Sequence, residues 1–173
     1  MQLLIRCVAT MSTLATMAVP ISAEAKDSAV CKAGLVCASD PQTVINALQA
    51  QGYKAKLDVD DQGDPDVVSA ASGYNFDVLF YGCVEHKQCD SLQFRVTFTK
   101  DPSNTLKLVN TWNLDKRFGQ MSLRNDGSIA LNQDITTVGG LTKENFDDAI
   151  DWWNSVLGAL PKFFDENLPP VKK

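Results

Sequence analysis

Four segments in the first half of the chain alternate apolar and polar residues, which is the pattern of strands with one buried face. They are residues 53–60, 66–72, 74–83 and 92–100. In the first segment the alternation directs Tyr53, Ala55, Leu57 and Val59 inward. The third segment is apolar on both faces near its middle, which indicates a central strand. Because only short turns separate the segments, the pattern predicts an antiparallel meander.

Helical patterns lie before and after these strands. Asp40 is a good N-cap and Pro41 suits a first helical turn, so a helix is predicted to begin there. A second helix is predicted around Trp112, where apolar residues recur every three or four positions. Residues 117–124 and 129–135 are predicted to form a hairpin, since Asn-Asp-Gly between them favours a tight turn. This order predicts one α+β domain, an antiparallel sheet meander with helices packed on one side.

The last helix is predicted to be the longest and to begin after the N-cap Thr142. One apolar stripe would seat it on the sheet: Phe146, Ile150, Trp153, Leu157, Leu160 and Phe164. Trp152, Val156 and Phe163 lie about 100° further around the helix. A second apolar side is either buried or meets a partner. We therefore predict these three residues as a candidate partner surface, the alternative being that the first helix covers them.

Composition narrows the range of partners. The chain has 173 residues, of which 45% are hydrophobic, so one domain with a substantial core is expected. The formal net charge of −5 argues against binding to nucleic acid. The chain contains no run of 18 apolar residues that would form a transmembrane helix.

Residues 1–25 have the layout of a secretory signal peptide, with one positive charge, an apolar stretch and small residues for cleavage after Ala23 or Ala25. The mature protein is thus expected in an exported compartment, a bacterial periplasm or the medium, with no stable membrane anchor. Beyond the leader we predict an N-terminal lead at 26–39, a single domain at 40–164 and a flexible tail at 165–173.

Four cysteines remain in the mature chain: Cys31, Cys37, Cys83 and Cys89. An even number in an oxidising compartment indicates two disulfides. Three connectivities exist in principle. The short separations favour two local loops, one closed by each neighbouring pair.

Candidate chemistry is sparse. The chain has a single histidine, His86, between Cys83 and Cys89, where a cystine is favoured over a metal clip because zinc needs four ligands and free thiolates. Nucleophile elbows, metalloprotease motifs and phosphate-cradling loops are absent from the sequence. We therefore predict no catalytic residue, no metal and no cofactor.

Residues 58–66, Asp-Val-Asp-Asp-Gln-Gly-Asp-Pro-Asp, place acids at the spacing of a calcium loop. Ser69 nevertheless stands where such a loop needs a bidentate glutamate, and both flanks have strand patterns rather than helical ones. Gly63 and Pro65 favour turns. A polar hairpin turn is the preferred interpretation, and a weak calcium site is the alternative.

Several ordered segments resemble YbjN-domain proteins, described as bacterial sensory transduction regulators. They include Phe80-Tyr-Gly-Cys83, Trp112-Asn113 followed by Arg117-Phe118, Asp126-Gly127, and Gly139-Gly140. The resemblance covers residues 40–164 and implies a fold like that of type III secretion chaperones, with no agreed enzymatic site. For Arg117 we predict stacking on Trp112 and an ion pair with Asp115 or Asp134.

These observations lead to a functional hypothesis. The protein is predicted to be a non-enzymatic, exported, chaperone-like regulatory module that binds a polypeptide or forms a homodimer. The alternative is a small hydrolase or ligand-binding protein with an unidentified carboxylate site. The signal peptide and cystines distinguish this chain from regulators that work in the cytosol.

Overall fold

The computed structural model describes residues 30–169 and contains three helices and eight strands. The helices are α1 (Pro41–Ala50), α2 (Leu106–Asp115) and α3 (Lys143–Asn167). The strands are β1 (Leu35–Val36), β2 (Ala55–Val59), β3 (Pro65–Ala71), β4 (Tyr74–Tyr81), β5 (Ser91–Phe98), β6 (Gln120–Leu123), β7 (Ile129–Thr136) and β8 (Leu141–Thr142). The predicted signal peptide lies outside the described residues.

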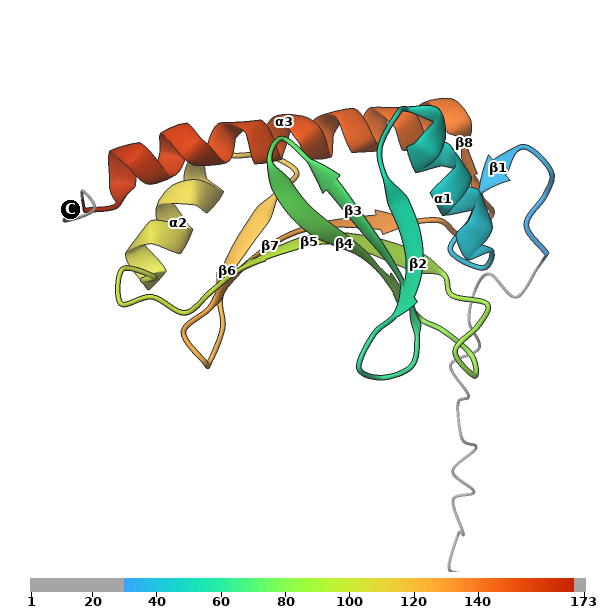
Figure 1. Cartoon of the computed structure of the whole chain (residues 1–173), viewed down its shortest axis with the longest axis horizontal. Coiled ribbons are helices and arrows are strands. Elements are labelled where there is room, and N and C mark those ends of the chain that lie inside the picture. Colours follow the sequence, from blue (N-terminus) through green and yellow to red (C-terminus); the bar gives the residue numbers. More distant parts are fainter. Residues whose placement is uncertain (1–29, 170–173) are drawn as a thin grey trace, which may run out of the picture.

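Six strands form one antiparallel sheet in the order β2-β3-β4-β5-β7-β6, and β1 pairs with β8 in a separate two-stranded sheet. The three helices lie on one side of the large sheet, which bows away from α3 at both ends (Figure 1). The predicted α+β class and the antiparallel sheet with helices on one side are confirmed. Within the described residues, no helix combines the length and apolarity needed to cross a bilayer.

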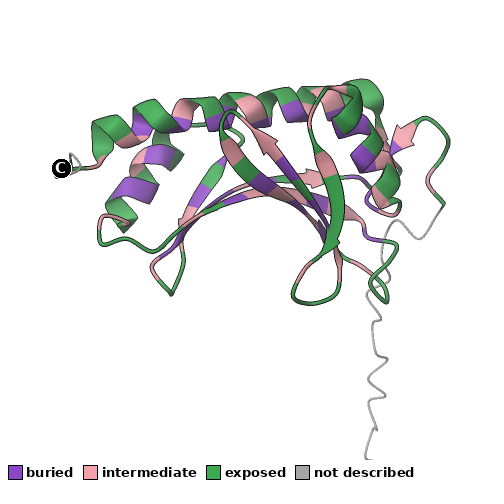
Figure 2. Ribbon diagram, viewed as in Figure 1, coloured by how far each residue is buried: buried purple, intermediate pink, exposed green. Residues whose placement is uncertain are grey.

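The core lies between α3 and the middle strands. Buried residues alternate with more exposed ones along β4 and β5, as the period of two requires (Figure 2). The ring of Trp153 contacts Phe76 on β4 and Phe94 on β5, with centroid distances of 5.8 and 5.9 Å. Asp40 caps α1 and Thr142 caps α3, each accepting a hydrogen bond from a backbone N–H of the first turn, as predicted.

Regular structure extends on both sides of the predicted domain 40–164. The segment 26–39 contains β1, in which Leu35 pairs with Thr142 and Val36 with Leu141. The buried hydroxyl of Thr137 accepts a hydrogen bond from the Ala38 N–H at 3.0 Å and thereby attaches this segment to the domain. A two-residue strand is too short to show an alternating pattern. At the other end α3 continues to Asn167, past the predicted domain boundary at residue 164.

Strand β2 also differs from the prediction. Leu57 and Val59 are 51% and 65% exposed, although both were expected to point into the core. Leu57 lies opposite the buried Val67, so it does project from the helix-bearing face. It remains exposed because β2 is the outermost strand and the ten-residue α1 leaves its second half uncovered.

Both local cysteine pairs lie at bonding distance, with Sγ–Sγ separations of 2.08 Å for Cys31–Cys37 and 2.09 Å for Cys83–Cys89. Cys31–Cys37 closes the segment around β1, and Cys83–Cys89 closes the connection between β4 and β5.

Peptide mapping without reduction should therefore recover links 31–37 and 83–89. Replacing Cys83 and Cys89 together by serine should lower the free energy of unfolding by about 2 kcal/mol, since short loops restrict the unfolded chain only modestly. A peptide that joins Cys31 to Cys83 or Cys89 would contradict the local pairing.

Candidate functional site

The predicted partner surface on α3 is largely covered within the chain itself. Trp152 is 43% exposed, but Val156 and Phe163 are each only 7% exposed. Phe163 meets the ring of Trp112 edge-on, with centroids 5.0 Å apart, and Val156 packs against the backbone of Gly119. The prediction that Val156 and Phe163 face a partner is therefore wrong. The cover comes from α2 and the loop after it rather than from α1.

The loop of residues 116–119, between α2 and β6, holds an aromatic ring at the surface. The Gly119 N–H donates to the Arg117 carbonyl at 2.8 Å and closes a three-residue γ-turn around Phe118. Phe118 has a φ of +67°, a conformation that is strained for a residue with a side chain, and γ-turns of this hand are rare. Backbone strain of this kind concentrates at functional sites.

This turn brings three side chains together on the surface. The Phe118 ring, 47% exposed, lies 4.6 Å from the Trp152 ring at an interplanar angle of 35°. The Arg117 guanidinium lies 5.0 Å from the centre of the Phe118 ring, within range of a cation–π contact. We call Arg117, Phe118 and Trp152 the aromatic patch.

The backbone beneath the patch is fixed by hydrogen bonds from the buried Trp112 and from Asn113. Trp112 Nε1 donates to the Gly119 carbonyl at 2.7 Å. The Asn113 side chain donates to the carbonyl of Met121 and accepts from its N–H, both at 2.9 Å. A Cβ atom on Gly119 would lie 2.5 Å from Val156, so only glycine lets the loop approach α3 this closely. The exposed rings are therefore presented by a preorganised loop.

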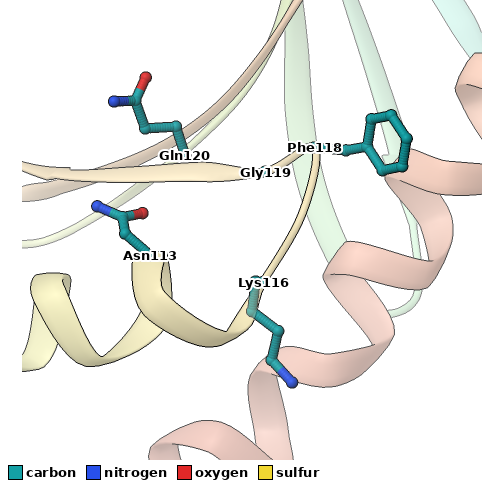
Figure 3. Close-up of a pocket in the computed structure, with 5 residues that line it drawn as sticks. All are labelled: Asn113, Lys116, Phe118, Gly119 and Gln120. Carbon is teal, nitrogen blue, oxygen red and sulfur yellow. The ribbon is translucent and has the colours of Figure 1, made fainter.

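A small cavity adjoins this loop, and Figure 3 shows the five residues that line it: Asn113, Lys116, Phe118, Gly119 and Gln120. The Phe118 ring points away from Asn113 and Gln120. The cavity volume of about 230 Å³ lies below the range of roughly 300–1,000 Å³ that is typical of small-molecule sites. The geometry thus favours contact with another surface over enclosure of a small ligand.

The predicted surroundings of Arg117 are corrected in two respects. Arg117 stacks on Phe118 rather than on Trp112, and the cation nearest the Trp112 ring is Lys116, whose Nζ lies 5.9 Å from the ring centre. Among residues 30–169, Arg117 makes no ion pair with an acid. Its positive charge is therefore free to meet an external acid.

The helix-free face of the sheet carries a cluster of polar side chains. Arg95 donates to Tyr81 Oη at 2.8 Å and to Asn132 Oδ1 at 3.0 Å, and it also bonds the Gln93 side chain. Gln93 in turn donates to Asp134 at 2.6 Å. These contacts join β4, β5 and β7 across the face.

On the same face lies a buried carboxyl group, that of Asp66, the last residue of the acidic segment 58–66. Asp66 is 9% exposed, and its Oδ1 has no hydrogen-bond partner in the described structure. Burial, reinforced by the negative charge of Asp77, raises the pKa of Asp66 to about 6. Burial also raises the pKa of Asp77, against the opposing effect of Arg95. The sequence does indicate this position. Successive side chains of a strand point to opposite faces, so Asp66 and Asp77, which precede the core-facing Val67 and Val78, lie on the face away from the core.

The acidic segment 58–66 forms a hairpin turn. Asp60 Oδ1 accepts hydrogen bonds from the N–H groups of Gln62 and Asp64, at 2.8 and 2.9 Å, and so stabilises the turn itself. Asp64 instead contacts His86 Nδ1 at 2.8 Å. Within the described part of the chain, no group of three His, Cys, Asp or Glu side chains has the geometry to hold a metal ion.

Millimolar calcium should consequently leave the melting temperature unchanged relative to the same sample with chelator, because the acids of this turn already serve local hydrogen bonds. A calcium-dependent rise of several degrees that disappears in Asp60→Ala would show that the calcium interpretation was right after all.

A further cavity, of about 850 Å³, lies between the end of β5 and the last turn of α3. Phe98 and Phe164 form an edge-to-face pair in its wall, with centroids 5.2 Å apart. Two of its polar side chains are engaged locally: Asp101 accepts from the Ser103 N–H, and the Asn104 amide donates to two backbone carbonyls. We assign no role to this cavity.

Comparisons with known proteins agree with this fold. The model of the YbjN family, described as "Putative bacterial sensory transduction regulator", matches residues 40–166. The crystal structure of YbjN from E. coli, described as "a putative transcription regulator", aligns with a TM-score of 0.51 at 12% identity, covering 73% of this chain and 94% of that one. An uncharacterised protein from Methanothermobacter thermautotrophicus aligns with a TM-score of 0.46 at 11% identity, covering 73% and 97%. No curated protein sequence matches the chain.

Proposed function

The chain belongs to the YbjN family, and from this premise we propose that it is an exported, non-enzymatic regulatory module that binds a polypeptide through the aromatic patch. The observation that carries the proposal is the stacked pair of Phe118 and Trp152, which stays exposed although the backbone is strained to hold it there. Exposed aromatic side chains next to an arginine are the groups enriched at protein interfaces.

The chemistry of the patch indicates the kind of segment that it would bind. Phe118 and Trp152 offer flat apolar surface, and Arg117 has no acidic partner in residues 30–169. A complementary segment therefore carries an apolar side chain beside an aspartate or glutamate. The acid would pair with Arg117 while the apolar side chain covers the two rings.

Export is the second element of the proposal. The leader-like residues 1–25 and the two local cysteine pairs support an oxidising compartment such as the periplasm. The alternative function, a carboxylate site for hydrolysis or ligand binding, has Asp66 and Asp77 as its best candidates. We rank it lower because Asp66 and Asp77 lie on the helix-free face of the sheet, and no cavity described here is lined by either of them.

The test uses Trp152→Asp, with Leu106→Asp as a control that places the same charge on another exposed apolar position of a helix. Both variants should keep the wild-type melting temperature within a few degrees, because both side chains are exposed. Wild type and Leu106→Asp immobilised on beads should retain the same polypeptide from an exported-protein extract, identified by mass spectrometry, and Trp152→Asp should lose it.

Tryptophan fluorescence provides a second measurement. Trp112 and Trp153 are fully buried, so acrylamide quenching reports mainly on Trp152. Adding the retained polypeptide should protect Trp152 from acrylamide. Unchanged retention by Trp152→Asp, or quenching that the polypeptide does not alter, would remove the aromatic patch as the binding site.

A further inference from the structure

Strand β2 leaves one edge of the large sheet open. Asp60 N–H donates to the Asp64 carbonyl where the β2–β3 hairpin begins, and Val59 lies opposite Pro65, which has no N–H. Because hydrogen bonds of an antiparallel pair use every second residue, Asp58 and Lys56 bond to β3. The backbone groups of Ala55, Leu57 and Val59 therefore point away from the sheet.

Two side-chain contacts agree with this direction. Gln49 Nε2 donates to the Ala55 carbonyl at 3.1 Å, and the Val59 N–H donates to Asp58 Oδ1 at 2.9 Å. Neither bond would form if these backbone groups faced β3. Within residues 30–169, no side chain bonds the N–H or C=O of Leu57, which lies between them at the centre of the edge.

Of the devices that protect an edge strand from pairing, β2 has charged side chains, Lys56 and Asp58, on one face only. β2 is exposed over most of its length (Figure 2) and contains neither a proline nor a bulge. Leu57 and Val59 project from one face, and Lys56 and Asp58 project from the other. An open edge with exposed apolar residues is a template for another strand.

The sequence of β2 indicates which strand that is. Ala-Lys-Leu-Asp-Val is complementary to itself when a second copy runs antiparallel with Leu57 on the two-fold axis. Lys56 then lies opposite Asp58 of the second copy on the polar face, and Ala55 lies opposite Val59 on the apolar face. In the same register, the N–H and C=O groups that point away from each sheet face each other. The N–H of each Leu57 therefore donates to the C=O of the Leu57 in the other copy.

We propose that the protein forms a symmetric dimer in which β2 pairs antiparallel with β2 of a second copy, making one continuous sheet. The charge pattern favours a second copy over an unrelated extended peptide. When a second copy of Lys-Leu-Asp runs antiparallel about Leu57, each lysine lies opposite an aspartate. Asp58 releases the Val59 N–H when it pairs with Lys56 of the other copy. The aromatic patch lies on the opposite end of the strand order, beside β6, and takes no part in this dimer.

Charge exchange tests the register. Sedimentation of the mature protein over a range of concentrations should show a monomer–dimer equilibrium. Lys56→Asp places two pairs of like charges across the interface and should weaken dimerisation about tenfold or more. The double exchange Lys56→Asp with Asp58→Lys should restore it, since opposite charges again face each other.

Two controls complete the experiment. Trp152→Asp should leave the dimer unchanged, and circular dichroism should show that each charge variant is folded. Hydrogen exchange of the Leu57 amide should slow as protein concentration rises, which reports on the interface in the unmodified chain. A monomer at every concentration overturns the proposal, as does a dimer that tolerates Lys56→Asp or one that Trp152→Asp dissociates.

Discussion

Replacing Trp153 by alanine should lower the free energy of unfolding by about 3–5 kcal/mol, the usual range for removing a large aromatic side chain from a core. Trp153 is fully buried and contacts Phe76 and Phe94 from the helix that covers the sheet. Its Nε1 has no acceptor among residues 30–169, so in this part of the chain the indole stabilises the fold through packing. Urea unfolding followed by circular dichroism measures the loss.

The neighbouring residue provides a matched control. Trp152→Ala removes the same side chain one position away, but from the exposed side of α3. Its stacking with Phe118 is lost but no fully buried packing is, so the free energy of unfolding should fall by about 1 kcal/mol. Equal losses for the two variants would contradict the assignment of Trp153 to the core and of Trp152 to the surface.

Replacing Asp66 by asparagine should stabilise the protein at pH 7. The folded state raises the pKa of Asp66 from its ordinary value near 3.8 to about 6, so the folded protein binds this proton more tightly than the unfolded chain does. The contribution of Asp66 to stability is therefore largest below about pH 4 and is lost as the pH rises to 6. The shift corresponds to a loss of the order of 3 kcal/mol as an upper bound, and about 1–2 kcal/mol is expected in practice because solvent on the helix-free face of the sheet screens this charge.

The measurement compares urea unfolding of wild type and Asp66→Asn between pH 4 and 7. The stability difference should grow in favour of the variant up to about pH 6 and then remain constant. Asp61→Asn, which removes an exposed carboxylate from the adjoining turn, controls for the change in net charge. A variant that is less stable than wild type at pH 7 would show that the Asp66 carboxylate makes a stabilising contact.

The elements with strong local signals could be predicted from the sequence. Asp40 and Thr142 mark helix starts because a side-chain oxygen can bond the first free N–H groups, and this is a property of neighbouring residues alone. The alternation in β4 and β5 likewise reflects one buried face per strand. The two cysteine pairs could be predicted for a similar reason, because the members of each pair are close together in the sequence.

The candidate site depends on contacts between distant residues, which is why less of it could be predicted. Trp152 and Val156 both lie off the main apolar stripe of α3, and only the arrival of α2 and its loop decides which one is covered. The positive φ of Phe118 follows from the bonds that Trp112 and Asn113 make to the backbone further along, not from its own propensity. Leu57 is a further example. The strand pattern predicts which face of the sheet its side chain projects from, but not whether a helix covers that part of the face.

The two cystines join residues only six positions apart. In a chain that crosses a membrane through a narrow channel with its N-terminus leading, as we propose for this one, Cys31 and Cys37 emerge almost together, well before Cys83 and Cys89. An oxidant can therefore close each pair before the next cysteines arrive. The order of emergence alone then favours the native connectivity among the three that exist. Oxidative maturation of this protein should accordingly need little help from a disulfide isomerase.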